Sequence, residues 1–193
     1  MLTCFEVADY FLSQCNRESG DLISNLKLQK LVYYAQGVSL AVLDRQLFPE
    51  RIEAWKHGPV VPDLYQKYKP YGDCGLPHVC IDINKYTHEE LSLLSFVDEE
   101  YGQFSAWKLR YMTHSEPPWK DAYLDFGFGS GYTNETIHHD AIKTHFASVL
   151  INKPCDYSFD YDLERMKEAV NSESVTIPSG MSFEEFDKFM TSL

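Results

Sequence analysis

Apolar and polar positions alternate at helical spacing from the very start of the chain. The first apolar stripe repeats every three or four residues, which predicts a helix over residues 4–17. Thr3 and Glu6 stand three residues apart at its start, the spacing of a capping box. The stripe consists of Cys4, Val7, Ala8, Phe11 and Cys15. Both of its cysteines are therefore predicted to pack in the core.

The next segment is apolar on nearly every side. Ser24 or Asn25 can cap a helix that runs to about residue 43, and polar residues in it are few. A helix of this kind belongs at the centre of a bundle. Lys30 is the charged exception, and we expect its ammonium to reach the surface or to pair with a carboxylate.

Further caps and stripes predict helices along the rest of the chain. The segments are 62–68, 87–102 with a Thr87 and Glu90 capping box, a helix capped by Ser105, a short turn at 117–119, 134–150, 163–170 and 182–193. The last two are separated from the others by Lys153 and Pro154. We therefore predict a helical domain over residues 1–152 and an acidic C-terminal extension over 153–193 with two short helices.

The pattern changes in the region of residues 47–56. Ile52 and Ala54 alternate with polar or larger neighbours, which favours a short β-hairpin here. Gly58 and Pro59 are then expected to turn the chain, because the residue before proline is pushed out of the helical region. The predicted fold class is mainly α: a compact domain of about six to seven helices with at most this one hairpin, plus a C-terminal helical extension.

Composition narrows the range of partners and compartments. The 193 residues are 44% hydrophobic, enough for a sizeable core, and 17 Lys and Arg stand against 29 Asp and Glu, a net charge of −12. This balance disfavours nucleic acid and favours a protein partner with a basic patch. The five cysteines contain no paired motif, and the longest uncharged run is too short to cross a bilayer, so we expect a cytoplasmic protein without a membrane segment.

Candidate metal and phosphate sites are weak. Cys74, His78 and Cys80 can supply three soft ligands, but their spacing lacks the paired knuckles of structural zinc sites. The glycine-rich segment 126–132 has neither the preceding strand nor the spacing of a dinucleotide fingerprint. No metal, cofactor or catalytic residue is predicted.

Three motifs recur together in one known family. They are Leu26–Gly37 with its Lys-Leu-Val-Tyr-Tyr-Ala-Gln-Gly string, Ile52–Pro62 with Ala-Trp-Lys-His-Gly-Pro-Val-Val-Pro, preceded by Leu47–Phe48 and followed by Tyr65, and His114–Trp119. In order and spacing they closely resemble the Panacea family, also described as SocA-like antitoxins or phage-associated GepA-type proteins. The resemblance extends over about residues 5–150, and His57 is a mild departure from it.

This resemblance implies a mainly helical domain of bacteria, phages and archaea, encoded beside a toxin gene. It implies an antitoxin that neutralises its cognate toxin by direct protein binding and has no catalytic activity of its own. The large motif residues are expected in the core: Leu28, Leu31, Tyr34, Trp55 and Trp119. Exposed toxin-binding residues are predicted elsewhere: Tyr33, Gln36, Lys56, His57, Gly58, Pro59, Phe126 and Phe128.

The extension after residue 152 carries 4 Lys and Arg against 9 Asp and Glu. Phe183, Phe186 and Met190 form an apolar stripe on its last predicted helix. This stripe can lie in a groove of the partner, or it can dock on the chain's own domain.

Two other function classes stay open from the sequence. One is a protein-interaction adaptor of phage or mobile-element origin without a toxin. The other is a hydrolase that uses His57 or the segment with His138, His139 and His145, which requires those histidines to converge in a deep polar pocket.

Overall fold

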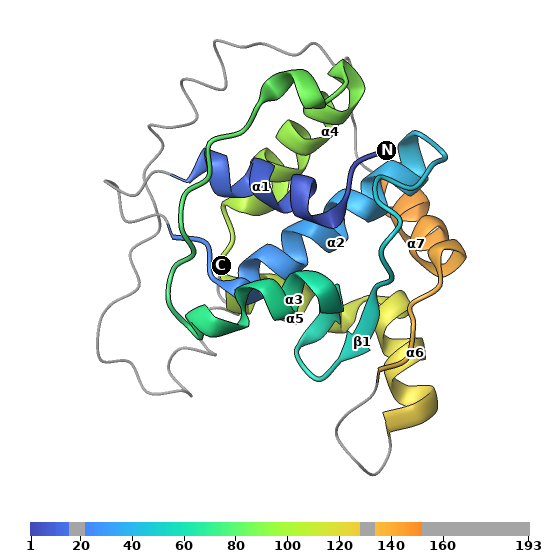
Figure 1. The fold of residues 1–193 in the computed structure, drawn as a ribbon. Helices are drawn as coiled ribbons and strands as arrows, with labels where there is room; N and C mark the ends of the chain where they lie inside the picture. Colours follow the sequence, from blue (N-terminus) through green and yellow to red (C-terminus); the bar gives the residue numbers. More distant parts are fainter. Residues whose placement is uncertain (16–21, 128–133, 152–193) are drawn as a thin grey trace.

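The computed structural model describes residues 1–15, 22–127 and 134–151, and these residues are mainly α-helical (Figure 1). The helices are α1 (Cys4–Gln14), α2 (Asn25–Val42), α3 (Pro62–Tyr68), α4 (His88–Val97), α5 (Ala106–Ser115), α6 (Pro117–Gly127) and α7 (His139–Ile151). The strands β1 (Glu53–Trp55) and β2 (Gly58–Val60) form one antiparallel hairpin. Two short 3₁₀ helices are η1 (Lys69–Tyr71) and η2 (Ile83–Lys85), and η3 (Asp98–Gly102) is a π-helical turn that continues α4. The predicted fold class is confirmed for this part of the chain; the extension over 153–193 lies outside the described residues.

Helix α2 is the centre of the bundle, as its all-round apolar pattern predicted. Fifteen of its 18 residues are buried. It packs against α1, α4, α5 and α7 as well as the hairpin strand β2 (Figure 1). Any polar residue in α2 must therefore find its partner inside the protein.

Four of the predicted helix caps are confirmed. The Thr3 and Glu6 capping box and the Thr87 and Glu90 capping box are both complete. The Ser24 hydroxyl accepts from the backbone N–H of Lys27, which decides between the two predicted caps of α2, and the Ser105 hydroxyl caps α5.

Several helix boundaries differ from the prediction: α1 ends at Gln14 rather than near residue 17, and α4 ends at Val97 rather than near residue 102. Helix α7 begins at His139 rather than near 134, because the preceding residues run beside β1: Ala54 N–H donates to the Glu135 carbonyl and Ile137 N–H donates to the Ile52 carbonyl, both at 2.8 Å. Helix α6 extends to Gly127, so that Phe126, predicted in a glycine-rich loop, belongs to a helix. The two prolines that suggested a short turn start this helix, where proline is tolerated.

The hairpin lies at residues 53–60, displaced from the predicted range of 47–56. Gly58 and Pro59 are not its turn but belong to β2, and Lys56 and His57 form the turn. Pro59 faces Ala54, whose N–H points away from β2 toward Glu135. The pair therefore needs no ladder hydrogen bond from proline, which has no N–H to give.

Candidate partner-binding surface

Lys30 lies fully buried beneath the hairpin. Its Nζ donates to the carbonyl oxygen of Pro59 at 2.7 Å, and its side chain has no solvent exposure. Burial lowers the pKa of Lys30 well below its usual value, and the nearby charge of Arg110 lowers it further. The expectation that Lys30 reaches the surface is wrong, because every side of α2 is covered.

Gly58 fits against Lys30 only because it has no side chain. A Cβ at this position would lie 2.7 Å from Lys30 Nζ and 2.8 Å from the Thr113 hydroxyl. Its φ of +98° is also one that L side chains rarely adopt. The glycine therefore lets β2 approach both α2 and α5, which brings the hairpin turn beside α5.

Two tyrosines of α2 share one carboxylate. The Tyr33 hydroxyl donates to Glu116 Oε2 at 3.0 Å, and the Tyr34 hydroxyl donates to Glu116 Oε1 at 2.8 Å. Burial raises the pKa of Glu116 to about 7, although the two hydroxyl groups and the charge of Lys30 act in the opposite direction. His145 Nε2 lies 3.9 Å from the same carboxylate.

Gln36 satisfies the backbone of the segment that follows α2. Its Oε1 accepts from the N–H groups of Leu47 and Phe48, at 2.9 and 3.2 Å, and its Nε2 donates to the Phe48 carbonyl. Neither Gln36 nor Tyr33 has any exposed surface. Their predicted exposure is wrong, because their polar atoms are used inside the protein and not toward solvent.

The hairpin is also held from α6. Trp119 Nε1 donates to the Trp55 carbonyl at 2.9 Å, and the His114 ring stacks on the Trp119 ring with centroids 3.9 Å apart. Burial and nearby positive charges lower the pKa of His114 to about 3, so the ring is neutral at physiological pH. Of the five motif residues predicted in the core, four are buried and Trp55 is half-buried.

The turn itself is exposed and meets α5. Lys56 and His57 are both exposed, as predicted, but the predicted exposure of Gly58 and Pro59 is wrong: both are buried, because β2 packs against α2 and α5. Arg110 Nε donates to His57 Nδ1 at 3.1 Å. Partial burial, together with the charges of Arg110, Lys56 and Lys30, lowers the pKa of His57. The imidazole is therefore neutral and carries its proton on Nε2.

Two exposed aromatic residues of α5 extend this surface. Trp107 is 46% and Tyr111 is 65% exposed, and they stand four residues apart on one helix face. The Arg110 guanidinium lies 5.4 Å from the centroid of the Trp107 ring. We call Lys56, His57, Trp107, Arg110 and Tyr111 the hairpin surface. The three α5 members of this surface were not predicted from the sequence. The predicted helix with Leu109 on its buried face would have placed Trp107 and Tyr111 on the opposite, exposed face.

The remaining predicted binding residues cannot be placed on this surface. Phe126 belongs to α6, but its side chain lies outside the described part of the structure. Phe128 and the tail residues Phe183, Phe186 and Met190 lie outside the described residues altogether. Their roles remain predictions.

The histidines do not converge. His57 contacts Arg110, His139 Nε2 lies 3.5 Å from Gln36 Nε2, and His145 lies beside Glu116. In residues 1–15, 22–127 and 134–151, no group of three or more His, Cys, Asp or Glu residues is arranged to hold a metal ion. None of the helices in these ranges combines the length and the apolar character that crossing a bilayer takes.

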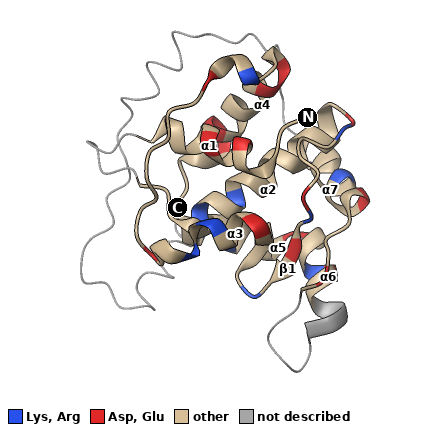
Figure 2. Cartoon of the chain, viewed as in Figure 1, with Lys and Arg blue, Asp and Glu red and all other residues tan. Residues whose placement is uncertain are grey.

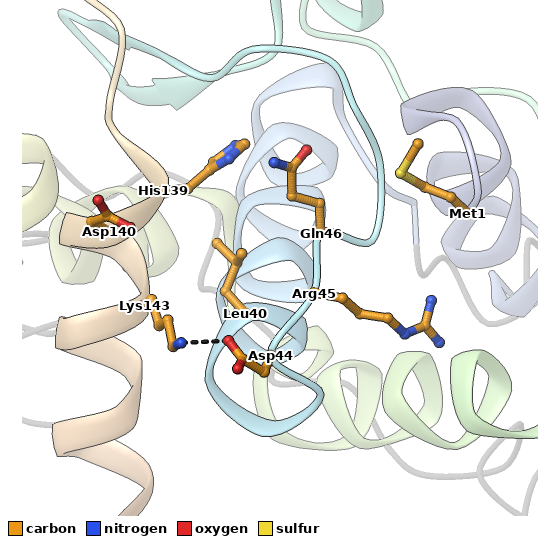
Figure 3. A pocket seen from close by; sticks show the side chains of 8 residues that line it. All are labelled: Met1, Leu40, Asp44, Arg45, Gln46, His139, Asp140 and Lys143. Atoms are coloured by element: carbon orange, nitrogen blue, oxygen red, sulfur yellow. Dashed lines mark hydrogen bonds and ion pairs between the residues drawn. The ribbon is translucent and has the colours of Figure 1, made fainter.

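An open depression of about 580 Å³ lies between α7 and the end of α2 (Figure 3). Its basic groups already have acidic partners: Lys143 pairs with Asp44, and Arg45 pairs with Glu89 and Glu90. Only His139 among the candidate histidines lines it. The geometry therefore lacks the convergent histidines that the hydrolase hypothesis requires.

A protein-family model matches the part of the chain that contains the polar contacts beneath the hairpin. The model of the family described as "Antitoxin SocA-like, Panacea domain" matches residues 28–120. Over these residues the chain is similar to SocA-like Panacea domains. The matched range includes Lys30, Pro59 and Glu116, and therefore the polar contacts beneath the hairpin surface.

A curated protein to which this chain is similar is named "Antitoxin SocA", from Caulobacter vibrioides (strain NA1000 / CB15N). The two sequences are 48% identical over 50 residues, which is 26% of this chain and 27% of that protein. The alignment thus spans about a quarter of the length of the relative. No solved structure matches the chain.

Proposed function

We propose that this chain is an antitoxin that neutralises a cognate toxin by direct protein–protein binding and catalyses no reaction itself. The observation that carries this proposal is the match of residues 28–120 to the SocA-like Panacea domain. The relative from Caulobacter vibrioides, also named an antitoxin, supports the same role.

The organisation of the motif residues is consistent with a binding role. The polar groups of three motif residues form hydrogen bonds inside the protein: Lys30, Tyr33 and Gln36. These residues therefore stabilise the fold rather than form a reaction centre. The hairpin turn with Lys56 and His57 remains exposed, and Arg110 of α5 contacts it through His57. Fixed contacts below an exposed turn give a partner a pre-organised surface, which lowers the entropy cost of binding.

The test is coexpression with the product of the adjacent gene. We expect that product to arrest growth when expressed alone, and growth to return when this chain is expressed with it. The two purified proteins should then form a complex that elutes as one species. A neighbour that is harmless alone, or rescue of growth without any physical complex, contradicts the proposal.

A further inference from the structure

The hairpin surface carries positive charge, whereas the chain as a whole is negatively charged. The chain has a net charge of −12, and in the described residues its carboxylates are distributed over many elements, including α1, α4, α7 and the hairpin strand β1 itself (Figure 2). The exposed Lys56 and the half-buried Arg110, which contacts His57 next to Lys56, bring two positive charges to this surface. Within the described ranges, no carboxylate lies at ion-pair distance from either of them.

The hydrogen-bonding groups of this surface are almost entirely donors. Lys56 and Arg110 have no acceptor atom, and the Trp107 indole can only donate. His57 uses its one acceptor nitrogen on Arg110, which leaves Nε2–H as the free group of the ring. Such a surface is complementary to a partner rich in acceptors, and the positive charge selects carboxylates over neutral carbonyl groups.

The aromatic residues add contact area. Trp107 and Tyr111 are two of the large hydrophobic residues that remain substantially exposed in the described chain. Trp, Tyr and Arg are the residue types that most often dominate binding energy at protein interfaces. Here all three occur within two turns of α5, and Arg110 contacts both His57 and Trp107.

We infer that the hairpin surface binds an acidic patch of the cognate toxin, with Lys56 and Arg110 facing its carboxylates and Trp107 and Tyr111 packing against the apolar groups between them. This inference rests on the proposed function, because the partner is the toxin. For this surface it predicts an acidic partner, whereas the overall negative charge of the chain suggests a basic one. A nucleic acid fits less well, since a long polyanion would also face the acidic remainder of the chain.

The test uses the full chain and the purified product of the adjacent gene, with affinity measured by calorimetry at low and at moderate salt. The main variant is Lys56→Glu, a change at an exposed residue, and the second is Lys56→Glu combined with Arg110→Glu. Tyr111→Ala tests the aromatic contribution. Lys85→Glu, in η2 beside α4 and away from the hairpin, and Tyr71→Ala are matched controls (Figure 1).

We expect Lys56→Glu to weaken binding at least tenfold at low salt, the double variant to weaken it further, and both to reduce the salt dependence. Tyr111→Ala should weaken binding severalfold, and both controls should stay within about twofold of the wild type. Circular dichroism and melting temperature confirm that each variant is folded. Hydrogen exchange on the toxin should show protection in a segment with an excess of Asp and Glu.

The outcomes separate the two proposals. If the wild type does not bind the neighbouring protein, the proposed function fails. If it binds and neutralises, but the hairpin variants behave like the controls or the protected segment of the toxin is basic, the inference is overturned while the function stands. It is also overturned if Lys56→Glu instead abolishes binding to a short DNA or RNA duplex, dissolves a dimer of the free chain, or removes exchange protection from residues 153–193 in the free chain.

Discussion

The ammonium of Lys30 and the carbonyl oxygen of Pro59 lie 2.7 Å apart, in a place with no access to solvent. This contact joins the central helix α2 to the second strand of the hairpin. Because the strand is held from below, the turn at Lys56 and His57 is presented outward in one position. The buried contact of Lys30 therefore holds the exposed turn in place.

Gly58 should be the most sensitive position in the hairpin. Gly58→Ala forces a Cβ against Lys30 and Thr113 and also demands a positive φ, so we expect a loss of roughly 3 kcal/mol in the free energy of unfolding. Gly72→Ala is the matched control, because Gly72 also has positive φ (+55°) but no atom within 4 Å of the added Cβ.

Urea denaturation of the two alanine variants separates conformational strain from the close approach. Gly72→Ala should lose only about 1–2 kcal/mol, from strain alone. The additional loss in Gly58→Ala reports the contact with Lys30 and Thr113. Equal losses in the two variants would show that the close approach does not limit stability.

Much of the fold could be read from the sequence because its signals are local. The capping boxes at Thr3 and Thr87 and the all-round apolar pattern of α2 each depend on residues a few positions apart. The hairpin was misplaced because its register depends on distant contacts, the carbonyl of Glu135 above all. The local sequence pattern does not indicate which distant residues will pair with a strand.

The site was harder to predict for the same reason. Tyr33 and Gln36 are plausible surface residues only as long as their partners are unknown. Those partners, Glu116 and the backbone of Phe48, lie elsewhere in the sequence. Lys56 and His57 were found correctly as exposed residues, since a hairpin turn is exposed whatever packs beneath it. Whether they bind a toxin is a separate, still untested prediction.

Gly37 allows α7 to pack closely on α2. An added Cβ would lie 2.4 Å from the ring of Phe146, which is nearly fully buried. We expect Gly37→Ala to cost about 2 kcal/mol, even though alanine favours the helix by about 1 kcal/mol. Thermal and urea unfolding provide the measurement.

A double-mutant cycle tests whether that contact is the cause. Phe146→Leu removes part of the ring that the new methyl group meets, so the Gly37→Ala, Phe146→Leu double variant should lose at least about 1 kcal/mol less than the sum of the single variants. Strict additivity would mean that the cost arises elsewhere.

Gln36 should be far less replaceable than the exposed Gln46. Gln36→Met keeps the approximate volume but leaves the N–H groups of Leu47 and Phe48 and the Phe48 carbonyl without their partner. Buried unsatisfied groups cost about 1–3 kcal/mol each, so a total of roughly 3 kcal/mol or more is expected. Gln46→Met at the surface should change stability by less than about 0.5 kcal/mol. Similar losses in a urea titration would refute the role assigned to Gln36.

Glu116 should give the protein a stability that falls as pH rises toward neutrality. Its pKa is raised by burial to about 7, above the ordinary carboxyl value that it recovers on unfolding. Between those two values the folded chain holds a proton that the unfolded chain has released, so the free energy of unfolding decreases with rising pH.

Glu116→Gln removes this titration while keeping a polar side chain of the same shape beside Tyr33 and Tyr34. From about pH 5 to about pH 7.5, the wild type should lose roughly 2 kcal/mol relative to the variant. His114, with its pKa lowered to about 3, works in the opposite direction because it must charge on unfolding in acid, but it is present in both proteins. Urea denaturation at fixed ionic strength measures the difference. Parallel pH curves for the two proteins would mean that Glu116 is already ionised in the folded state at the lower pH.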